Sequence, residues 1–273
     1  MNLTSPTQVK AWCIENGFHP NKVLGQNFLI DQNALKAIVD AGLEGCKVSE
    51  LQGCRVLEIG PGLGVLTEEM LKRGCRVTAI EKDPVLAARL KESLGNPEGL
   101  TVIEGDALDV IAQGTRHEAQ GTNYACMISN LPYQAGTRIL LELVRRRELP
   151  SMTVLVQTEV AERLAAGPGS KTRGLAGVWA QLDYDVRLVR KVAASCFWPR
   201  PEIGSSVVRL ERHERNAELS DSRRDLFHRL TKQAFEHRRK QLGSIFKDLI
   251  QSTARAEDLS NKDWVDLVKG LTE

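Results

Sequence analysis

RVLEIGPGLGVLT, the sequence of residues 55–67, decides the fold. Its apolar run at 56–59 is the kind that a strand carries when both faces of a parallel sheet are covered. The glycines of Gly60–Gly64 then let the backbone turn sharply and approach a ligand at a place where a Cβ would interfere. From Val65 the sequence favours a helix. We therefore predict a buried strand, a glycine-rich turn and a helix.

The alternation of strand and helix continues along the chain. Further strands are predicted at 76–80, 100–104, 125–129 and 152–157, with a last pair at 184–192 and 205–211. This spacing is typical of βαβ units and predicts an α/β fold with a mostly parallel sheet and helices on both faces. The segment 24–29, LGQNFL, has neither a helical nor a strand period.

The character of the sequence changes near Glu214, where polar, helix-forming sequence without strands begins. We predict a main domain over residues 1–213 and a small helical domain over residues 214–273. Residues 212–247 hold 10 Lys or Arg against 5 Asp or Glu, although the formal charge of the whole chain is only +2. Local charge is therefore more informative about partners than net charge.

Six cysteines are present, none of them in C-x-x-C spacing: Cys13, Cys46, Cys54, Cys75, Cys126 and Cys196. They predict reduced, mostly buried thiols and no metal site. No apolar run is long enough for a membrane span, and the N-terminus lacks the apolar region of a signal peptide. We expect a cytoplasmic monomer.

Four consecutive predicted strands end in glycine-rich or polar groups: Gly60–Gly64, Glu81, Asp106 and Asn130–Tyr133. In an open parallel sheet, ligands bind outside the carboxyl ends of the strands. Glu81 lies 21 residues after Gly60, where a carboxylate is placed to accept both hydroxyls of a ribose. Asp106 is suited to accept from an adenine amino group. The alternatives are a surface carboxylate for Glu81 and a helix cap for Asp106.

The glycine turn has the spacing G-x-G-x-G and not the G-x-G-x-x-G of dinucleotide enzymes. Glu58, two residues before Gly60, would repel a phosphate but suits a ligand with an ammonium or sulfonium charge. These two features favour S-adenosylmethionine over a nicotinamide dinucleotide.

Asn130-Leu131-Pro132-Tyr133 is the most specific motif. The lone pair of an exocyclic base amine is delocalised into the ring, and acceptors against its two N–H bonds free that lone pair for attack. The Asn130 side-chain oxygen and the Leu131 carbonyl are suitable acceptors. Pro132 stiffens the turn, and Tyr133 offers a ring for a splayed-out base. The alternative is a capped turn with a buried tyrosine.

The chain resembles the KsgA-type rRNA adenine dimethyltransferases, which act on small-subunit 16S rRNA. The resemblance rests on LGQNFLID at 24–31, VLEIGPGLGVLT at 56–67, AIEKDPVLAARL at 79–90, GDAL at 105–108, SNLPY at 129–133, FWPRP at 197–201 and AFEHRRKQL at 234–242. It implies the Rossmann-like class I methyltransferase sheet with an antiparallel final strand. Gln134 and Gly204 depart from the residues usual in the family.

The resemblance also implies site residues. The expected contacts to S-adenosylmethionine are Asn27, Leu29, Gly60, Gly62, Glu81, Lys82, Asp106, Ala107 and Asn130. Phe197 is expected as a second aromatic wall of the adenine pocket, with core packing as the alternative. The implied reaction is dimethylation of the 6-amino group of two adjacent adenosines in a hairpin near the 3′ end of 16S rRNA, with a role in small-subunit biogenesis.

RNA of this kind is held mainly through its phosphates. The candidate contacts are basic residues, for each of which a plain solvated surface is the alternative: Arg145, Arg146, Arg147, Lys171, Arg173, Arg238, Arg239 and Lys240. Other functions stay open, namely a methyltransferase of another nucleic-acid adenine, a dehydrogenase, or a mainly non-enzymatic ribosome assembly factor.

Overall fold

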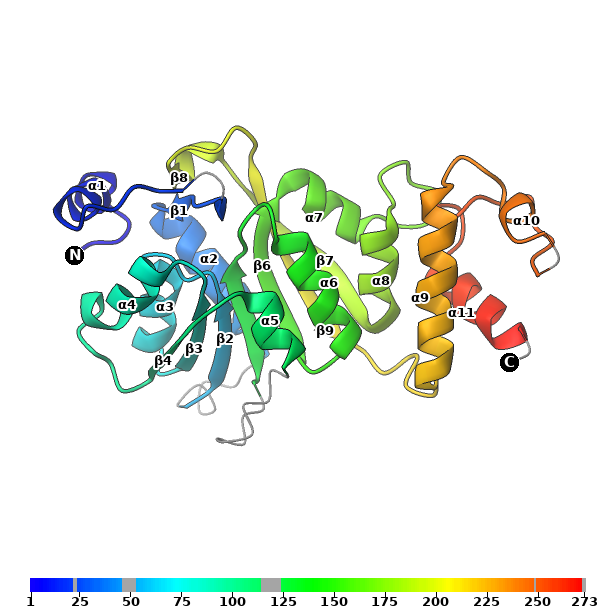
Figure 1. Ribbon diagram of the computed structural model, residues 1–273, viewed down its shortest axis with the longest axis horizontal. Coiled ribbons are helices and arrows are strands. Elements are labelled where there is room, and N and C mark those ends of the chain that lie inside the picture. The colour runs from blue at the N-terminus through cyan, green and yellow to red at the C-terminus, as the bar shows by residue number, and fades with distance from the viewer. Residues whose placement is uncertain (22–23, 46–52, 114–123, 248, 272–273) are drawn as a thin grey trace. The chain divides into compact units, whose positions relative to one another are not determined.

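A computed structural model describes residues 1–21, 24–45, 53–113, 124–247 and 249–271. Its main sheet has seven strands in the order β4-β3-β2-β5-β6-β9-β7 (Figure 1). The pairs among β4, β3, β2, β5 and β6 are parallel, and β9 runs antiparallel to β6. The predicted fold class is confirmed. The strand bounds are β2 Arg55–Ile59, β3 Arg76–Glu81, β4 Leu100–Glu104, β5 Cys126–Asn130, β6 Ser151–Gln157, β7 Tyr184–Val192 and β9 Ser205–Arg212.

Helices flank the strands of this sheet (Figure 1). Three of them begin with aspartate caps: the side chains of Asp31, Asp83 and Asp106 accept hydrogen bonds from main-chain N–H groups of the first turn. The helices of this part are α1 Pro6–Glu15, α2 Gln32–Gly42, α3 Val65–Lys72, α4 Pro84–Ser93, α5 Ala107–Ala112, α6 Gly136–Arg146 and α7 Thr158–Ala165.

The strand register brings the predicted strand ends together. Ile59 pairs with Ile80 across β2 and β3, and Glu81 pairs with Glu104 across β3 and β4. Asn130, the last residue of β5, pairs with Leu155 of β6. Because these strands are parallel, their carboxyl ends share one edge of the sheet.

A second sheet has two short strands that the sequence analysis did not predict. β1, Phe28–Leu29, pairs antiparallel with β8, Phe197–Trp198. The N–H of Ile30 extends this ladder by donating to the Cys196 carbonyl at 2.8 Å. Two-residue strands carry no period, so this pairing of segments far apart in sequence is a product of the tertiary fold.

The chain divides into two compact units. The first holds residues 1–161 and 187–211, and the second holds residues 162–186 and 212–273. The second unit thus includes residues 162–186, which lie before the boundary predicted at 213. Its core surrounds Phe227 and Trp264, and its helices are α8 Leu175–Asp183, α9 Asp221–Glu236, α10 Leu242–Ile245 and α11 Asn261–Gly270.

A buried ion pair supports this second core, in which both oxygens of Asp183 accept from Arg224 at 2.7 and 2.8 Å.

Four of the five described cysteines are buried, and Cys46 lies outside the described residues. Most of the loop predicted at 113–123 also lies outside them. Within the described ranges, no helix has the length and hydropathy that a membrane span requires.

Candidate active site

A cavity of about 200 Å³ opens at the carboxyl ends of β2, β3, β4 and β5. Every predicted contact to S-adenosylmethionine lines it, and so do Leu131, Pro132 and Tyr133. The wall also includes residues that the sequence analysis did not assign to the cavity, among them Leu3 and Gln26. Sequence order separates these residues widely, so the parallel register is what gathers them.

The glycine turn forms one wall of this cavity. Gly62 has a φ of +59°, and a Cβ on it would lie 3.0 Å from the Phe28 ring. The turn is held by Glu81, whose two carboxylate oxygens accept from the main-chain N–H groups of Gly62 at 3.0 Å and Asp83 at 2.9 Å. Glu81 is therefore fixed in orientation, while each oxygen keeps a lone pair for a further donor.

Glu58 contributes a buried carboxyl group to the same cavity. Its side chain is 1% exposed and accepts a hydrogen bond from the Thr67 hydroxyl at 2.6 Å. Burial raises the pKa of Glu58 to about 8. A positive ligand in the cavity would stabilise the ionised form and lower that pKa.

Replacing Glu58 by Gln tests this electrostatic role. Because the protonated carboxyl must lose its proton to gain from a positive ligand, donor affinity of the unmodified protein should rise with pH up to about 8. The rise should approach about tenfold per pH unit, and Glu58→Gln should flatten it. Calorimetric titration of S-adenosylmethionine at a series of pH values measures both profiles. If the profiles of the unmodified protein and of Glu58→Gln have the same slope, groups other than Glu58 cause the pH dependence.

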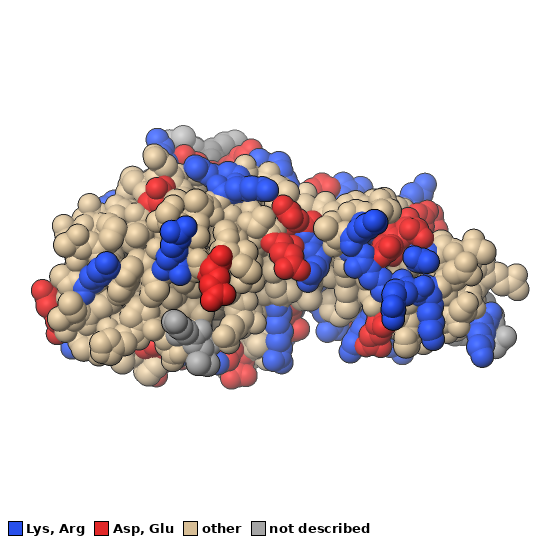
Figure 2. Space-filling model, turned by 90° about the horizontal axis from the view of Figure 1, so that it is seen from above, with Lys and Arg blue, Asp and Glu red and all other residues tan. Residues whose placement is uncertain are grey.

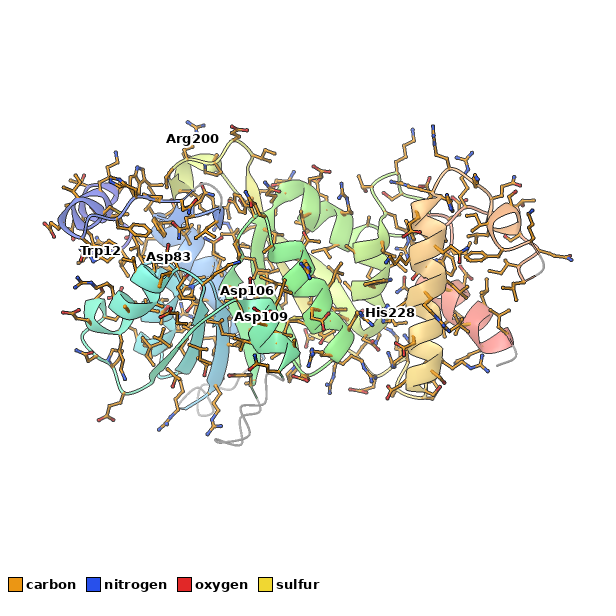
Figure 3. All side chains as sticks on the ribbon, viewed as in Figure 1. Trp12, Asp83, Asp106, Asp109, Arg200 and His228 are labelled. Carbon is orange, nitrogen blue, oxygen red and sulfur yellow. The ribbon has the colours of Figure 1, made fainter. Side chains whose placement is uncertain are left out.

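Asp106, which is labelled in Figure 3, acts both as a helix cap and as a partner in an ion pair. Its Oδ1 accepts from the Leu108 N–H at 2.9 Å, and its Oδ2 pairs with the Lys82 ammonium at 2.7 Å. The Lys82 hydrogen bond is the main cause that lowers the pKa of Asp106. The capping alternative is thus present in the structure, and the carboxylate still lines the cavity.

Asn130 has an unusual hydrogen-bonding state. Its Nδ2 donates to the Asn27 main-chain oxygen at 3.1 Å. This hydrogen bond fixes the orientation of the side-chain amide. Its Oδ1 is buried and has no hydrogen-bond partner among the described residues. A buried acceptor without a donor is costly, so its retention indicates a donor supplied by a ligand.

The Tyr133 ring and Pro132 complete this part of the cavity. The Tyr133 hydroxyl shares a 2.6 Å hydrogen bond with Ser205 Oγ on β9, and burial is the main cause that raises its pKa. Pro132 lies beside the glycine turn, with its Cδ 3.6 Å from where a Cβ of Gly60 would be. The turn at Asn130–Tyr133 and the glycine turn are therefore adjacent in the cavity wall.

Phe197 does not line the cavity in this structure. Its side chain is 2% exposed and belongs to the hydrophobic core of the first unit, where β8 pairs with β1. The placement favours the core-packing alternative over a wall of the adenine pocket. Its strand holds the segment that carries Asn27, so the contribution of Phe197 to the site is indirect.

The second side of the cavity was predicted only in part: the family resemblance indicated Asn27 and Leu29, but not Leu3, Gly25 or Gln26. Leu3, in the N-terminal segment, is 5% exposed and lines it. Gly25 has a φ of +65°, and a Cβ there would lie 3.1 Å from the Tyr133 nitrogen. Gln26 Nε2 donates to Asp83 at 3.0 Å. The LGQNFL segment has no helical or strand period, so only the family resemblance indicated that it lies at the ligand site.

The predicted RNA contacts differ in accessibility. Lys171, Arg239 and Lys240 in the second unit are exposed, as is Arg145 in the first. On the face drawn in Figure 2, basic side chains gather over the part of the chain that carries the C-terminal helices. Arg146 pairs with Glu142 at 3.3 Å, and Arg147 is the C-terminal cap of α6.

Two arginines are committed to internal contacts. Arg173 is fully buried and donates to Ala166, Gln181 and Asn261. Arg173 is therefore absent from the outer surface over which an RNA backbone would run, which argues against the predicted contact. Arg238 pairs with Glu257 and donates to the Lys171 carbonyl, so part of its charge is used within the second unit.

A match to the family described as ribosomal RNA adenine dimethylase spans residues 17–270. The chain belongs to this family. Ribosomal RNA small subunit methyltransferase A of Deinococcus radiodurans is 45% identical over 213 residues, which cover 77% of this chain and 67% of that protein. The protein of the same name from Alkaliphilus oremlandii is 38% identical over 88% of this chain and 82% of its own length. The predicted enzyme class, an rRNA adenine dimethyltransferase, is confirmed.

Solved structures of similar fold include a dimethyladenosine transferase from Plasmodium falciparum, with a TM-score of 0.72 and 23% identity over 88% of this chain and 95% of that one. The 23S rRNA methyltransferase ErmE has a TM-score of 0.66 and 22% identity over 89% and 98%. These two similarities show that the fold is shared. A methyltransferase family with a Rossmann-like sheet implies S-adenosylmethionine as donor.

Proposed function

We propose that this adenine dimethylase methylates the 6-amino groups of two adjacent adenosines in a hairpin near the 3′ end of 16S rRNA, and that it acts in small-subunit biogenesis. The relatives named small subunit methyltransferase A support the small subunit as the source of the substrate. A monomer acting on ribosomal precursors in the cytoplasm fits this proposal.

The observation that carries the proposal is the buried, unpartnered Asn130 Oδ1. Asn27 holds the other end of the amide, so the acceptor stays directed away from that contact. An adenine amine would donate to this oxygen and to the Leu131 carbonyl. Both bonds draw the amine nitrogen towards tetrahedral geometry, which makes its lone pair available.

The donor side fits the same cavity. When bound, S-adenosylmethionine supplies an activated methyl group, and it would be held by Glu81, Asp106 and the main chain at Gly60 and Gly62. Glu81 offers oriented acceptors for hydroxyls, and Glu58 offers a carboxyl that ionises beside positive charge. The chain contributes position more than acid–base chemistry, and alignment of two reactants is worth on the order of 7–11 kcal/mol.

Tyr133 is proposed as the stacking surface for the extruded adenine. Its hydroxyl is fixed by Ser205, so the ring has little freedom to rotate away. Aromatic stacking on a base contributes about 1–3 kcal/mol. The motif thus combines two acceptors for the amine with one surface for the ring.

The direct experiment incubates the protein with labelled S-adenosylmethionine and undermethylated small subunits, then maps the label. We expect dimethylation of two adjacent adenosines near the 3′ end of 16S rRNA. Intact 23S rRNA serves as the control substrate. Label on another RNA, or on a base other than adenine, would overturn the proposed substrate.

Charge reversal tests the RNA contacts of the second unit. Arg239 and Lys240 are exposed, so Arg239→Glu with Lys240→Glu should not disturb the core. The double variant should bind the substrate RNA about tenfold or more weakly and show a shallower dependence on salt, because fewer counterions are released. Filter binding at several salt concentrations measures both effects. Lys72→Glu, on α3 of the first unit, is the control, and an unchanged salt slope would remove these residues from the interface.

A further inference from the structure

The second compact unit contains a cavity of its own, of about 630 Å³. Its lining comes from the segment before α8, from the start of β7, from residues 213–218 and from α11. The methyl transfer chemistry uses none of these residues. Two of them, Arg173 and His213, have buried nitrogens without a hydrogen-bond partner among the described residues, and Lys262 is an exposed cation at the rim.

Arg173 is a buried cation without a counter-ion. Its side chain is fully buried, and its partners are neutral oxygens: Ala166 O at 2.8 Å, Gln181 Oε1 at 3.1 Å and Asn261 Oδ1 at 2.7 Å. Its Nε has no hydrogen-bond partner among the described residues. Buried charges are normally paired, because desolvation costs several kcal/mol per ion. This guanidinium therefore lacks an anion.

His213 lines the same cavity near the Gln181 main chain, and within the described ranges neither of its ring nitrogens makes a hydrogen bond of normal geometry. Its main-chain N–H is used, since it donates to the Asp183 carbonyl at 2.9 Å. Burial is the main cause that lowers its pKa, so the ring is neutral near pH 7 and carries one N–H donor.

Other charges around the cavity largely cancel. Asp185 is held by Arg215 through two hydrogen bonds at 2.6 and 3.2 Å, and Glu218 pairs with Lys269 at 2.7 Å. Asp266 and Lys262 are both exposed and carry opposite charges, so the charge left over is that of Arg173. Lys262 lines the cavity and forms no ion pair with the residues that the structure describes. The uncompensated charge in the cavity is thus positive.

We propose that this cavity binds a small phosphate-type oxyanion. Such an anion accepts from the Arg173 Nε, the His213 N–H and the Lys262 ammonium, and it supplies the charge that Arg173 lacks. A metal cation would be repelled by the same guanidinium. An apolar ligand would leave the Arg173 charge without a counter-ion and the His213 ring without a partner.

The test measures the thermal midpoint of the full chain in inorganic phosphate, with chloride at equal ionic strength as reference and S-adenosylmethionine saturating the first cavity. Phosphate should raise the midpoint saturably, since a ligand of the native state stabilises it. Arg173→Gln should lower phosphate affinity about tenfold or more. Lys262→Ala should lower it about threefold. Lys232→Ala, another exposed lysine of the second unit, should leave it unchanged.

If Arg173→Gln does not fold, Lys262→Ala and His213→Gln carry the test against the same control, with line broadening in phosphorus NMR as the direct readout. Stabilisation equal to that in chloride, or equal affinity in all variants, would overturn the proposal. Binding of short RNA at this cavity without any response to free phosphate would overturn the small-anion assignment as well.

Discussion

Asn130→Ala should reduce methyl transfer by about 10² to 10³ while leaving donor affinity within about threefold of the unmodified protein. The buried Oδ1 has no partner among the described residues, so the substitution costs the native fold one hydrogen bond, the one from Nδ2 to the Asn27 carbonyl. It removes the proposed acceptor of the adenine amine. The rate constant under single-turnover conditions measures the loss, and calorimetry with S-adenosylmethionine measures the donor affinity.

The matched control is Asn16→Ala. Asn16 Nδ2 donates to the Trp12 carbonyl at 2.8 Å, an interaction of the same kind as that from Asn130 to Asn27, but outside the cavity. The control should transfer methyl groups at the normal rate. Equal activity in both variants would show that the Asn130 acceptor takes no part in the reaction.

Glu81→Gln should weaken binding of S-adenosylmethionine by about 10- to 100-fold, a change that corresponds to the loss of charge-assisted hydrogen bonds. The carboxylate accepts from Gly62 and Asp83 at the same time, and an amide has one oxygen with which to replace two. The NH₂ group would face one of these N–H donors. The substitution should therefore weaken the acceptors for the ribose hydroxyls and also disturb the conformation of the glycine turn.

Glu104→Gln is the control for this variant. Glu104 pairs with Glu81 in register at the end of the neighbouring strand, is exposed and does not line the cavity. Its substitution should leave donor affinity unchanged. With saturating donor, Glu81→Gln should regain most of its rate, because the acceptors at Asn130 and Leu131 are intact. A rate that stays low at saturation would place Glu81 in the chemical step.

The identity of the reaction was accessible from local sequence. The apolar run before Gly60 acts over a few residues and formed the predicted strand, and the helix cap at Asp106, which was the alternative to a ligand contact, formed as well. The position of the strand ends could be predicted as well, because parallel strands place their carboxyl ends at one edge of the sheet regardless of loop structure.

Two outcomes depended on contacts between distant segments. The pairing of β1 with β8 moved Phe197 into the core and set Asn27 against Asn130. Arg173 was grouped with exposed cations because residue type reports charge and not burial. In the structure it lies inside the second unit.

By itself, the sequence determined the sheet, the glycine turn and the residues gathered at its edge, since periodicity and capping are local and the βαβ connection leaves few topologies. Only the tertiary structure decided which polar atoms remain without partners. Asn130 Oδ1 and Arg173 Nε stand out because burial removes water as an alternative partner, and burial is a property of the packed chain.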